Sequence, residues 1–181
     1  GDNRSQYLLG LMFNSGEGVE QDYGKGASWL TKSAEQGNAF AQFNLGDMYI
    51  KGDGVSKDDN QAFHWFRKSA EQGNAEAQSY LGFMYNRGRG VPQNYSQATD
   101  WFRKAAEQGD AYAQYNLGLM YFNGEGLPQN YSQAASWFRK AGTQGHSDSL
   151  NNLGLGYEFG QYGAKNLVLA HIFLNLAAVN G

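Results

Sequence analysis

The sequence predicts an all-α fold, a right-handed α/α solenoid of five 36-residue helix-turn-helix repeats, and three observations support this prediction. Tryptophan recurs every 36 residues, at Trp29, Trp65, Trp101 and Trp137. A Leu-Gly pair recurs at the same interval in all five repeats. Residues 75–110 and 111–146 are identical at 23 of 36 positions without a gap. Self-similarity at a fixed period of this size is typical of stacked helical repeats.

The period also sets the repeat boundaries. The repeats cover residues 3–38, 39–74, 75–110, 111–146 and 147–181, and we expect them to form a single solenoid domain over residues 1–181. Of the 25 glycines, 20 fall on four positions of the repeat, so the glycine excess belongs to the repeat and not to a linker. Gly1 and Gly181 both occupy the position that closes a repeat, and we therefore expect the five repeats to be part of a longer array.

The first half of each repeat is predicted to be a helix. In the second repeat this helix covers residues 39–51, and its apolar side chains recur at helical spacing: Ala41, Leu45, Met48 and Tyr49. Gly52 and Gly54 follow, and glycine tolerates the positive φ that ends a helix and allows a tight turn. We therefore expect a short glycine loop after the first helix of each repeat.

The second half of each repeat is also predicted to be a helix. In the second repeat, Asp58 or Asp59 provides the N-cap, as Asn94 and Asn130 do in later repeats, and the helix continues to about Glu71. Its inward-facing residues are Ala62, Trp65, Phe66, Ser69 and Ala70.

A glycine in the middle of the first helix requires a packing explanation. Gly46 follows Leu45 in the helix interior, where glycine costs about 1 kcal/mol relative to alanine. We expect compensation from the close approach of the second helix or of the next repeat's first helix. Accordingly, Gly82→Leu is expected to lower the melting temperature strongly.

The repeat resembles the Sel-one-like repeat (SLR) family, a relative of the tetratricopeptide repeat. The resemblance covers essentially the whole chain and rests on three motifs, which in the third repeat comprise Leu81, Gly82, Met84 and Tyr85; Gly88, Gly90 and Val91; and Ala98, Trp101, Phe102, Lys104, Ala105 and Ala106. The resemblance implies an α/α solenoid whose first helices line the concave wall. It also implies a protein-binding adaptor or scaffold, most often bacterial, in the periplasm, at the cell surface or secreted. The fifth repeat departs from the pattern at Gly156, Tyr162 and Leu167.

Four positions of the first helix vary freely between repeats, and they share one face of that helix. They are the second, fifth, ninth and twelfth positions of the repeat, whose spacing of three and four residues is helical. Several are aromatic or apolar although the repeat does not require it, and such exposed clusters are typical of binding surfaces. We predict that the variable faces of successive first helices line a concave groove in which another protein or an extended peptide binds. The predicted binding residues are Phe40, Phe43, Asn44, Asp47, Ile50, Ser79, Phe83, Asn86, Tyr112, Tyr115, Asn116, Leu119, Phe122 and Asn152.

Two alternatives to this interpretation stay open. Some of the aromatic side chains can contact the first helix of the neighbouring repeat instead of a ligand. Asn44, Asn116 and Asn152 carry amides that can bind a peptide backbone, as in the related tetratricopeptide grooves, or can bond an adjacent repeat.

Composition argues against several other function classes. The net charge of −3 argues against nucleic-acid binding, which requires a basic surface. The absence of cysteine excludes a disulfide scaffold, a thiol nucleophile and a zinc-cysteine site. The longest apolar stretch, residues 167–179, is interrupted by His171 and Asn175 and is too short to span a bilayer.

We expect no catalytic activity, metal or cofactor. His64, His146 and His171 lie in three different repeats without metal-binding spacing, and the Gly-x-Gly loops lack the residues of a phosphate-binding loop. Two alternatives are a hydrolase acting on cell-wall or β-lactam compounds, an activity attributed to cysteine-rich relatives, and a self-assembling envelope structural protein. Self-association would use the uncapped last repeat, which is expected to expose Leu167, Leu169, Phe173, Leu174 and Leu176.

Overall fold

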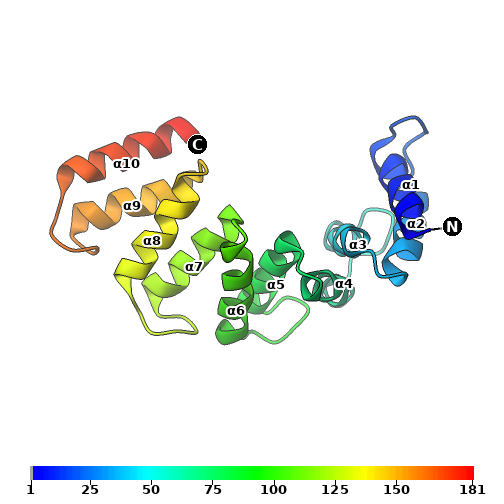
Figure 1. The fold of residues 1–181 in the computed structure, drawn as a ribbon, viewed down its shortest axis with the longest axis horizontal. Helices are drawn as coiled ribbons and strands as arrows, with labels where there is room; N and C mark the ends of the chain where they lie inside the picture. Colours follow the sequence, from blue (N-terminus) through cyan, green and yellow to red (C-terminus); the bar gives the residue numbers. More distant parts are fainter. Residues whose placement is uncertain (1) are drawn as a thin grey trace. The chain divides into compact units, whose positions relative to one another are not determined.

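The computed structural model describes residues 2–181, and Gly1, predicted to close a preceding repeat, lies outside the described residues. Across residues 2–181 there are ten α-helices and no strand, so the predicted all-α fold of five two-helix repeats is confirmed (Figure 1). The helices are α1 (Asn3–Ser15), α2 (Tyr23–Glu35), α3 (Ala39–Lys51), α4 (Asp59–Glu71), α5 (Ala75–Arg87), α6 (Tyr95–Glu107), α7 (Ala111–Asn123), α8 (Tyr131–Gly142), α9 (Ser147–Phe159) and α10 (Leu167–Asn180).

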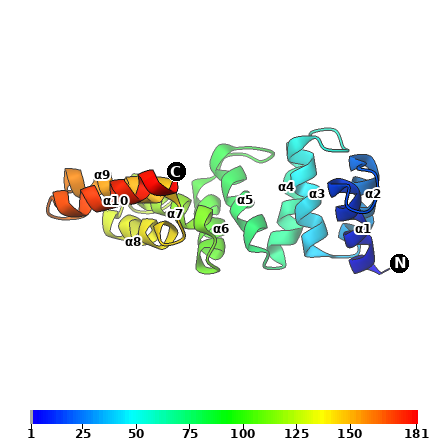
Figure 2. The same cartoon turned by 90° about the horizontal axis from the view of Figure 1, so that it is seen from above.

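The helices fall into two compact units. The N-terminal unit ends at Gln93 and the C-terminal unit comprises residues 94–181. The single solenoid domain that the sequence predicts stays a prediction. Inside the N-terminal unit, α3 packs against α4 of its own repeat and against α2 of the preceding repeat (Figure 2). Inside the C-terminal unit, α7 packs in the same way against α8 and α6.

The predicted helix ends in the second repeat are confirmed. Gly52 adopts a left-handed conformation, with φ of 87°, and its N–H donates to the carbonyl of Met48 at 2.7 Å. The N-cap of α4 is Asp58, whose carboxylate accepts from the N–H groups of Asn60 and Gln61. Each helix therefore begins and ends where its capping residue satisfies backbone groups that the helix leaves unpaired.

In four of the five repeats, the glycine within the first helix lies close against the second helix of the same repeat: Gly10, Gly46, Gly118 and Gly154. A Cβ atom added to Gly46 would lie 2.8 Å from Cδ1 of Phe66, a fully buried side chain of α4. At Gly118 the distance to Cε1 of Phe138 in α8 would be 2.6 Å. The second helix of the same repeat thus takes up the space, which is one of the two neighbours that the sequence analysis considered.

Buried glutamines join consecutive repeats. The Gln42 side chain in α3 donates to the carbonyl of Ala34 at the end of α2, at 3.0 Å. The same glutamine accepts from Gln72 at 2.7 Å. Equivalent bonds join Gln78 to Ala70 and Gln114 to Ala106, both at 3.1 Å. These side chains satisfy carbonyl groups that a helix C-terminus would otherwise leave unpaired.

The second loop glycine of a repeat contacts the main chain of the preceding repeat. A Cβ atom on Gly54 would lie 2.1 Å from the carbonyl oxygen of Tyr23, the first residue of α2. The equivalent distance is 2.2 Å from Gly90 to the Asp59 oxygen. A residue with a side chain would therefore separate the two repeats at this point.

The fifth repeat exchanges a large and a small residue. Gly156 stands where the other repeats have methionine, and Tyr162 stands where they have the second loop glycine. The Tyr162 ring occupies the space above Gly156, since a Cβ atom there would lie 1.9 Å from the ring. Tyr162 also packs edge-to-face on Tyr157 and donates to the carbonyl of Asn152 at 3.2 Å. The two departures from the repeat pattern thus compensate for each other.

Candidate functional site

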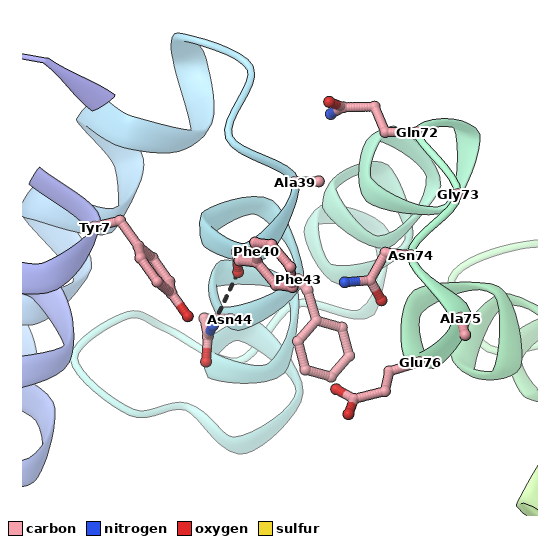
Figure 3. Close-up of a pocket in the computed structure, with 10 residues that line it drawn as sticks. All are labelled: Tyr7, Ala39, Phe40, Phe43, Asn44, Gln72, Gly73, Asn74, Ala75 and Glu76. Carbon is pink, nitrogen blue, oxygen red and sulfur yellow. Dashed lines mark hydrogen bonds between the residues drawn. The ribbon is translucent and has the colours of Figure 1, made fainter. Parts of the chain in front are cut away.

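A pocket of about 590 Å³ lies in the N-terminal unit, beside the N-terminal ends of α3 and α5 (Figure 3). Its lining residues come from α1, α3, α5 and the turn that joins α4 to α5: Tyr7, Ala39, Phe40, Phe43, Asn44, Gln72, Gly73, Asn74, Ala75 and Glu76. Three of the residues predicted to bind a partner, Phe40, Phe43 and Asn44, are among them. Tyr7 and Glu76 occupy the fifth and second positions of their repeats, and so belong to the same variable stripe.

The aromatic side of the pocket combines one exposed ring, Phe40, with one half-buried ring, Phe43. Phe40 is 62% exposed, and its ring centroid lies 6.3 Å from that of Tyr7. Phe43 is half-buried, with centroid distances of 5.6 Å to Phe66 and 5.8 Å to Tyr80. Phe40 is therefore available to a ligand, whereas Phe43 also contributes to the packing of α3 on α4 and α5.

Polar side chains complete the pocket, and most are partly engaged in internal hydrogen bonds. The Asn44 amide donates to the carbonyl of Phe40 at 2.8 Å, as the dashed line in Figure 3 marks. Asn74 is the N-cap of α5 and accepts from the N–H of Ala77 at 2.8 Å. Gln72 donates to Gln42 at 2.7 Å. These contacts fix the side chains before any ligand arrives.

The other predicted residues of the N-terminal unit lie outside this pocket. Asp47 forms an ion pair with Lys51 at 2.6 Å. Ser79 is 3% exposed, and therefore offers little surface to a partner. The remaining residues of this group are half-buried: Ile50, Phe83 and Asn86.

In the C-terminal unit, the predicted aromatic residues are largely occupied by packing. Tyr115 stacks on the His146 ring, with centroids 4.6 Å apart, and lies 6.0 Å from Phe138. Phe122 contacts Tyr131 edge-to-face at 5.2 Å. Leu119 packs with Tyr115 and Phe122 against the buried core of α8 and α9. Tyr112, at 44% exposed, is the aromatic residue of α7 that presents most surface.

The three predicted asparagines make the same local contact. Asn44, Asn116 and Asn152 each donate to the carbonyl four residues earlier in their own helix, at 2.8 Å. The sequence analysis considered a ligand and an adjacent repeat as partners, and did not consider this helical carbonyl. Asn116 is only 9% exposed. Asn44 and Asn152 are half-buried and so more exposed than Asn116.

Tyr80 is a residue that the sequence analysis missed. It is 38% exposed and stacks on Phe66 with centroids 4.8 Å apart. Burial raises the pKa of Tyr80, and the charge of Asp47 raises it further. The repeat spacing could have identified it, because Tyr80 occupies the repeat position at which Asn44, Asn116 and Asn152 stand in other repeats.

The histidines are placed separately from one another. His64 packs edge-to-face on Trp65, and burial together with Lys68 and Arg67 lowers its pKa. His171 is exposed and bonds Asn175 at 3.0 Å. Over residues 2–181, no group of three or more histidine or acidic side chains could hold a metal ion.

One serine–histidine pair is present at the start of α9. His146 is the N-cap of α9, and its Nδ1 lies 3.1 Å from Oγ of Ser149. Ser149 is fully buried, so a substrate cannot reach this hydroxyl. The pair therefore serves as a helix cap.

No helix in the described part of the chain is long and apolar enough to cross a bilayer.

Comparison with known proteins identifies the family of the repeat. The model of the Sel1 repeat matches residues 3–38, 39–74, 75–110, 111–146 and 147–181. A protective antigen of uropathogenic Escherichia coli with an SLR fold is similar in structure, with a TM-score of 0.95 and 37% identity. The match covers 99% of this chain and 38% of that antigen, so the chain spans well under half of the antigen's length. A search of curated proteins by sequence found no match.

Two further solved structures are similar. A Sel1 repeat protein of Oxalobacter formigenes has a TM-score of 0.89 and 34% identity, over 99% of this chain and 74% of that protein. Cysteine-rich protein B of Helicobacter pylori has a TM-score of 0.58 and 24% identity, over 74% of this chain and 96% of that protein. The likeness to the Helicobacter protein is one of fold alone.

Proposed function

Because the chain belongs to the Sel1 repeat family, whose members generally act as protein–protein interaction scaffolds, we propose that it binds an extended segment of another protein in the aromatic pocket of the N-terminal unit. One observation carries the proposal. A pocket of about 590 Å³ displays Phe40, Phe43 and Tyr7 at repeat positions that vary freely between repeats. Pockets of roughly 300–1,000 Å³ with aromatic walls and a few fixed polar groups are typical of binding sites.

The pocket would hold one or two side chains of the bound segment. Phe40 would act as the aromatic anchor, since exposed rings of this kind dominate the energetics of many interfaces. The side-chain oxygen of Asn44 and the amide nitrogen of Asn74 would bond the backbone of the segment, which offers both a donor and an acceptor at each residue. The rest of the segment would continue along α3 past Asp47 and Ile50.

A peptide library displayed on phage tests this proposal. We expect Phe40→Ala to weaken the selected peptides at least tenfold, or about 1.4 kcal/mol, because truncating an anchor removes its contacts. Phe40 is 62% exposed, so circular dichroism should show an unchanged fold. The control is Phe159→Ala, which removes a ring that is 70% exposed at the end of α9 and outside the pocket. Equal affinity of both variants for the peptides would refute the proposal.

The predicted residues of α7 require a separate variant. Tyr115 contacts Phe138 and His146, so its replacement would perturb packing as well as binding. Tyr112 is 44% exposed and is the better probe. We propose that α7 provides further contacts for a long segment, and Tyr112→Ala should then weaken long peptides while leaving short ones unaffected.

The outer face of α10 favours a second candidate function, self-association. Four apolar side chains spaced four, four and three residues apart form a stripe there, with exposures of 70, 45, 44 and 84%: Val168, Ile172, Leu176 and Val179. The corresponding residues of α8 are polar: Ser132, Ser136, Lys140 and Thr143. These four residues of α8 stay exposed even though the next repeat packs on α8 through α9. By the same geometry, a further repeat packed on α10 would leave the apolar stripe uncovered.

The exposed apolar surface of the last repeat differs from the sequence-based expectation. Leu167 and Leu176 are exposed as expected. Leu169, Phe173 and Leu174 are half-buried, and the Phe173 ring stacks on Tyr157 of α9 with centroids 5.8 Å apart. These three residues face the core because α10 packs against α9, and the outer stripe described above takes their place at the surface.

We propose that a second copy of the chain covers the stripe. Two uncharged stripes can meet in an isologous contact without burying a charge. Since α10 is about 21 Å long, the contact would be smaller than the roughly 800 Å² per partner of a stable interface, and the dimer would be weak.

Sedimentation velocity over a concentration series tests the dimer. Ile172→Glu should shift the protein to monomer, whereas Ser136→Glu, at the corresponding position of α8, should leave the dimer intact. A monomer at every concentration of the unmodified protein, or a dimer that survives Ile172→Glu, would contradict the proposal.

A further inference from the structure

The aromatic pocket of the N-terminal unit has one charged side chain, Glu76, in the first turn of α5. Two acidic groups next to lining residues in the sequence or one turn away are compensated: Lys51 pairs with Asp47 at 2.6 Å, and Arg67 pairs with Glu71 at 2.8 Å. Across residues 2–181, no lysine or arginine forms an ion pair with Glu76. The lining residues also include no lysine and no arginine. The pocket therefore carries a net negative charge.

Hydrogen-bonding groups at the pocket point to a ligand that donates. Gln72 uses both side-chain N–H groups, on Gln42 and on the carbonyl of Lys68, and Asn44 uses one of its two on the carbonyl of Phe40. The side-chain oxygens of both residues are left to accept. With the Glu76 carboxylate, they make three acceptor groups among the side chains that line the pocket, all labelled in Figure 3. Asn74 is the exception, because its oxygen is used as the α5 cap and its amide nitrogen is left to donate. Acceptors thus outnumber donors among the side chains that the internal contacts leave available.

The aromatic rings favour the same kind of ligand. Tyr7 and Phe40 both line the pocket, with their ring centroids 6.3 Å apart and their planes inclined at 37°. The face of an aromatic ring attracts a cation, with a gain of about 0.5–2 kcal/mol that increases as water is excluded. Rings that line the same pocket as an uncompensated carboxylate are a suitable site for an ammonium or guanidinium group.

The helix N-termini at the pocket oppose this preference but are weaker. The first turns of α3 and α5 carry a partial positive charge of about half an elementary charge each. Asn38 already accepts from the N–H groups of Phe40 and Ala41, and Asn74 accepts from Ala77. These caps reduce what the helix ends offer to an anion. Because both helix ends are already capped, the full charge of the Glu76 carboxylate exceeds what they still offer.

We propose that this pocket selects a lysine or arginine side chain of the bound segment. This inference rests on the peptide-binding function proposed above. The cationic head group would lie between the ring faces of Tyr7 and Phe40 and the Glu76 carboxylate. Its N–H groups would donate to the side-chain oxygens of Asn44 and Gln72.

Three capped heptapeptides test the selection by heteronuclear NMR titration of the isotope-labelled protein. They share a glycine, serine and leucine framework and differ only at the central residue, which is arginine, citrulline or glutamate. Citrulline has the shape of arginine without its charge. We expect the arginine peptide to bind about tenfold more tightly than the citrulline peptide, with shifts at the backbone amides of Asn44, Gly73 and Glu76.

Two variants assign the effect to one carboxylate. Glu76→Gln should reduce the ratio of arginine to citrulline affinity to about one. Glu107→Gln changes the net charge equally on α6, outside the pocket, and should preserve the ratio. A ratio that persists in Glu76→Gln, or tightest binding of the glutamate peptide, would overturn the inference.

The same titration separates this inference from the function on which it rests. If all three peptides bind at the pocket with equal affinity, peptide binding stands and the cation preference is wrong. If none shifts the pocket amides while arginine-rich peptides from the phage library also fail to bind, both proposals are wrong.

Discussion

Gly118→Ala provides a sharp test of how the two helices of a repeat pack. In the structure, the added Cβ atom would lie 2.6 and 2.7 Å from Cε1 and Cδ1 of Phe138, and 3.2 Å from Cζ. Non-bonded carbon atoms prefer separations of about 3.5–4.0 Å, so the ring would have to move by roughly 1 Å. Phe138 is fully buried among residues of α7, α8 and α9, which leaves no space for that movement.

Two opposing effects determine the size of the change. Alanine in a helix interior is favoured over glycine by about 1 kcal/mol. Overpacking a dense core costs about 1–3 kcal/mol, and two contacts this short place the cost near the upper end. We therefore expect a net loss of about 1–2 kcal/mol in the free energy of unfolding. For a chain of this length, that loss lowers the melting temperature by roughly 2–8 °C.

Thermal unfolding followed by circular dichroism and by calorimetry measures the effect. The matched control is Gly24→Ala in the first turn of α2, where the residue is exposed and the nearest atom is the side-chain oxygen of Asp22 at 3.3 Å. There alanine should raise stability by up to about 1 kcal/mol, since it restricts the unfolded chain.

A second background checks the cause of the loss. In a Phe138→Ala protein the obstructing ring is gone, so Gly118→Ala should become stabilising in place of destabilising. An unchanged or increased melting temperature for Gly118→Ala alone would refute the close-packing explanation, and so would an equal loss in the Phe138→Ala background.

Two further predictions concern pH and salt. Burial raises the pKa of Tyr162, so the folded protein keeps the phenol proton at a pH near 10, where the unfolded chain loses it. The free energy of unfolding should therefore fall as the pH rises above about 10, and it should fall less steeply in Tyr162→Phe. Urea unfolding at a series of alkaline pH values measures both. Arg89 donates to Asp59 through two N–H groups, at 2.6 and 3.1 Å, and both side chains are about one-third exposed. Arg89→Gln should lower the free energy of unfolding by about 1 kcal/mol or less, and this difference should shrink in about 1 M salt.

The fold could be predicted from sequence because each local signal recurs. The ends of α3 and α4 were predictable since Gly52 and Asp58 are repeated capping positions, and one repeat supports the interpretation of another. Compensation in the fifth repeat was not predictable. Gly156 and Tyr162 appeared as separate departures from the pattern, and only their spatial contact shows that one side chain fills the space left by the other.

The candidate site was predictable in part. Spacing alone placed Phe40 and Phe43 on a variable face, and both line the pocket. Spacing could not show that Ser79 is buried. Nor could it show that Asn44 bonds its own helix, because an amide has several local carbonyls within reach. The turn from Gln72 to Asn74 was also missed, since it lies between the helices to which the periodicity applies.

The glycine contacts between repeats have a consequence for how such a protein changes over generations. At Gly54 and Gly90 the neighbouring repeat is met through its main-chain carbonyl, at Tyr23 and Asp59 respectively. Main-chain atoms are the same whatever side chains a repeat carries, so a duplicated 36-residue segment arrives with a compatible joint at this point. Unequal recombination can then lengthen or shorten the array by whole repeats, while the variable face of each copy diverges on its own.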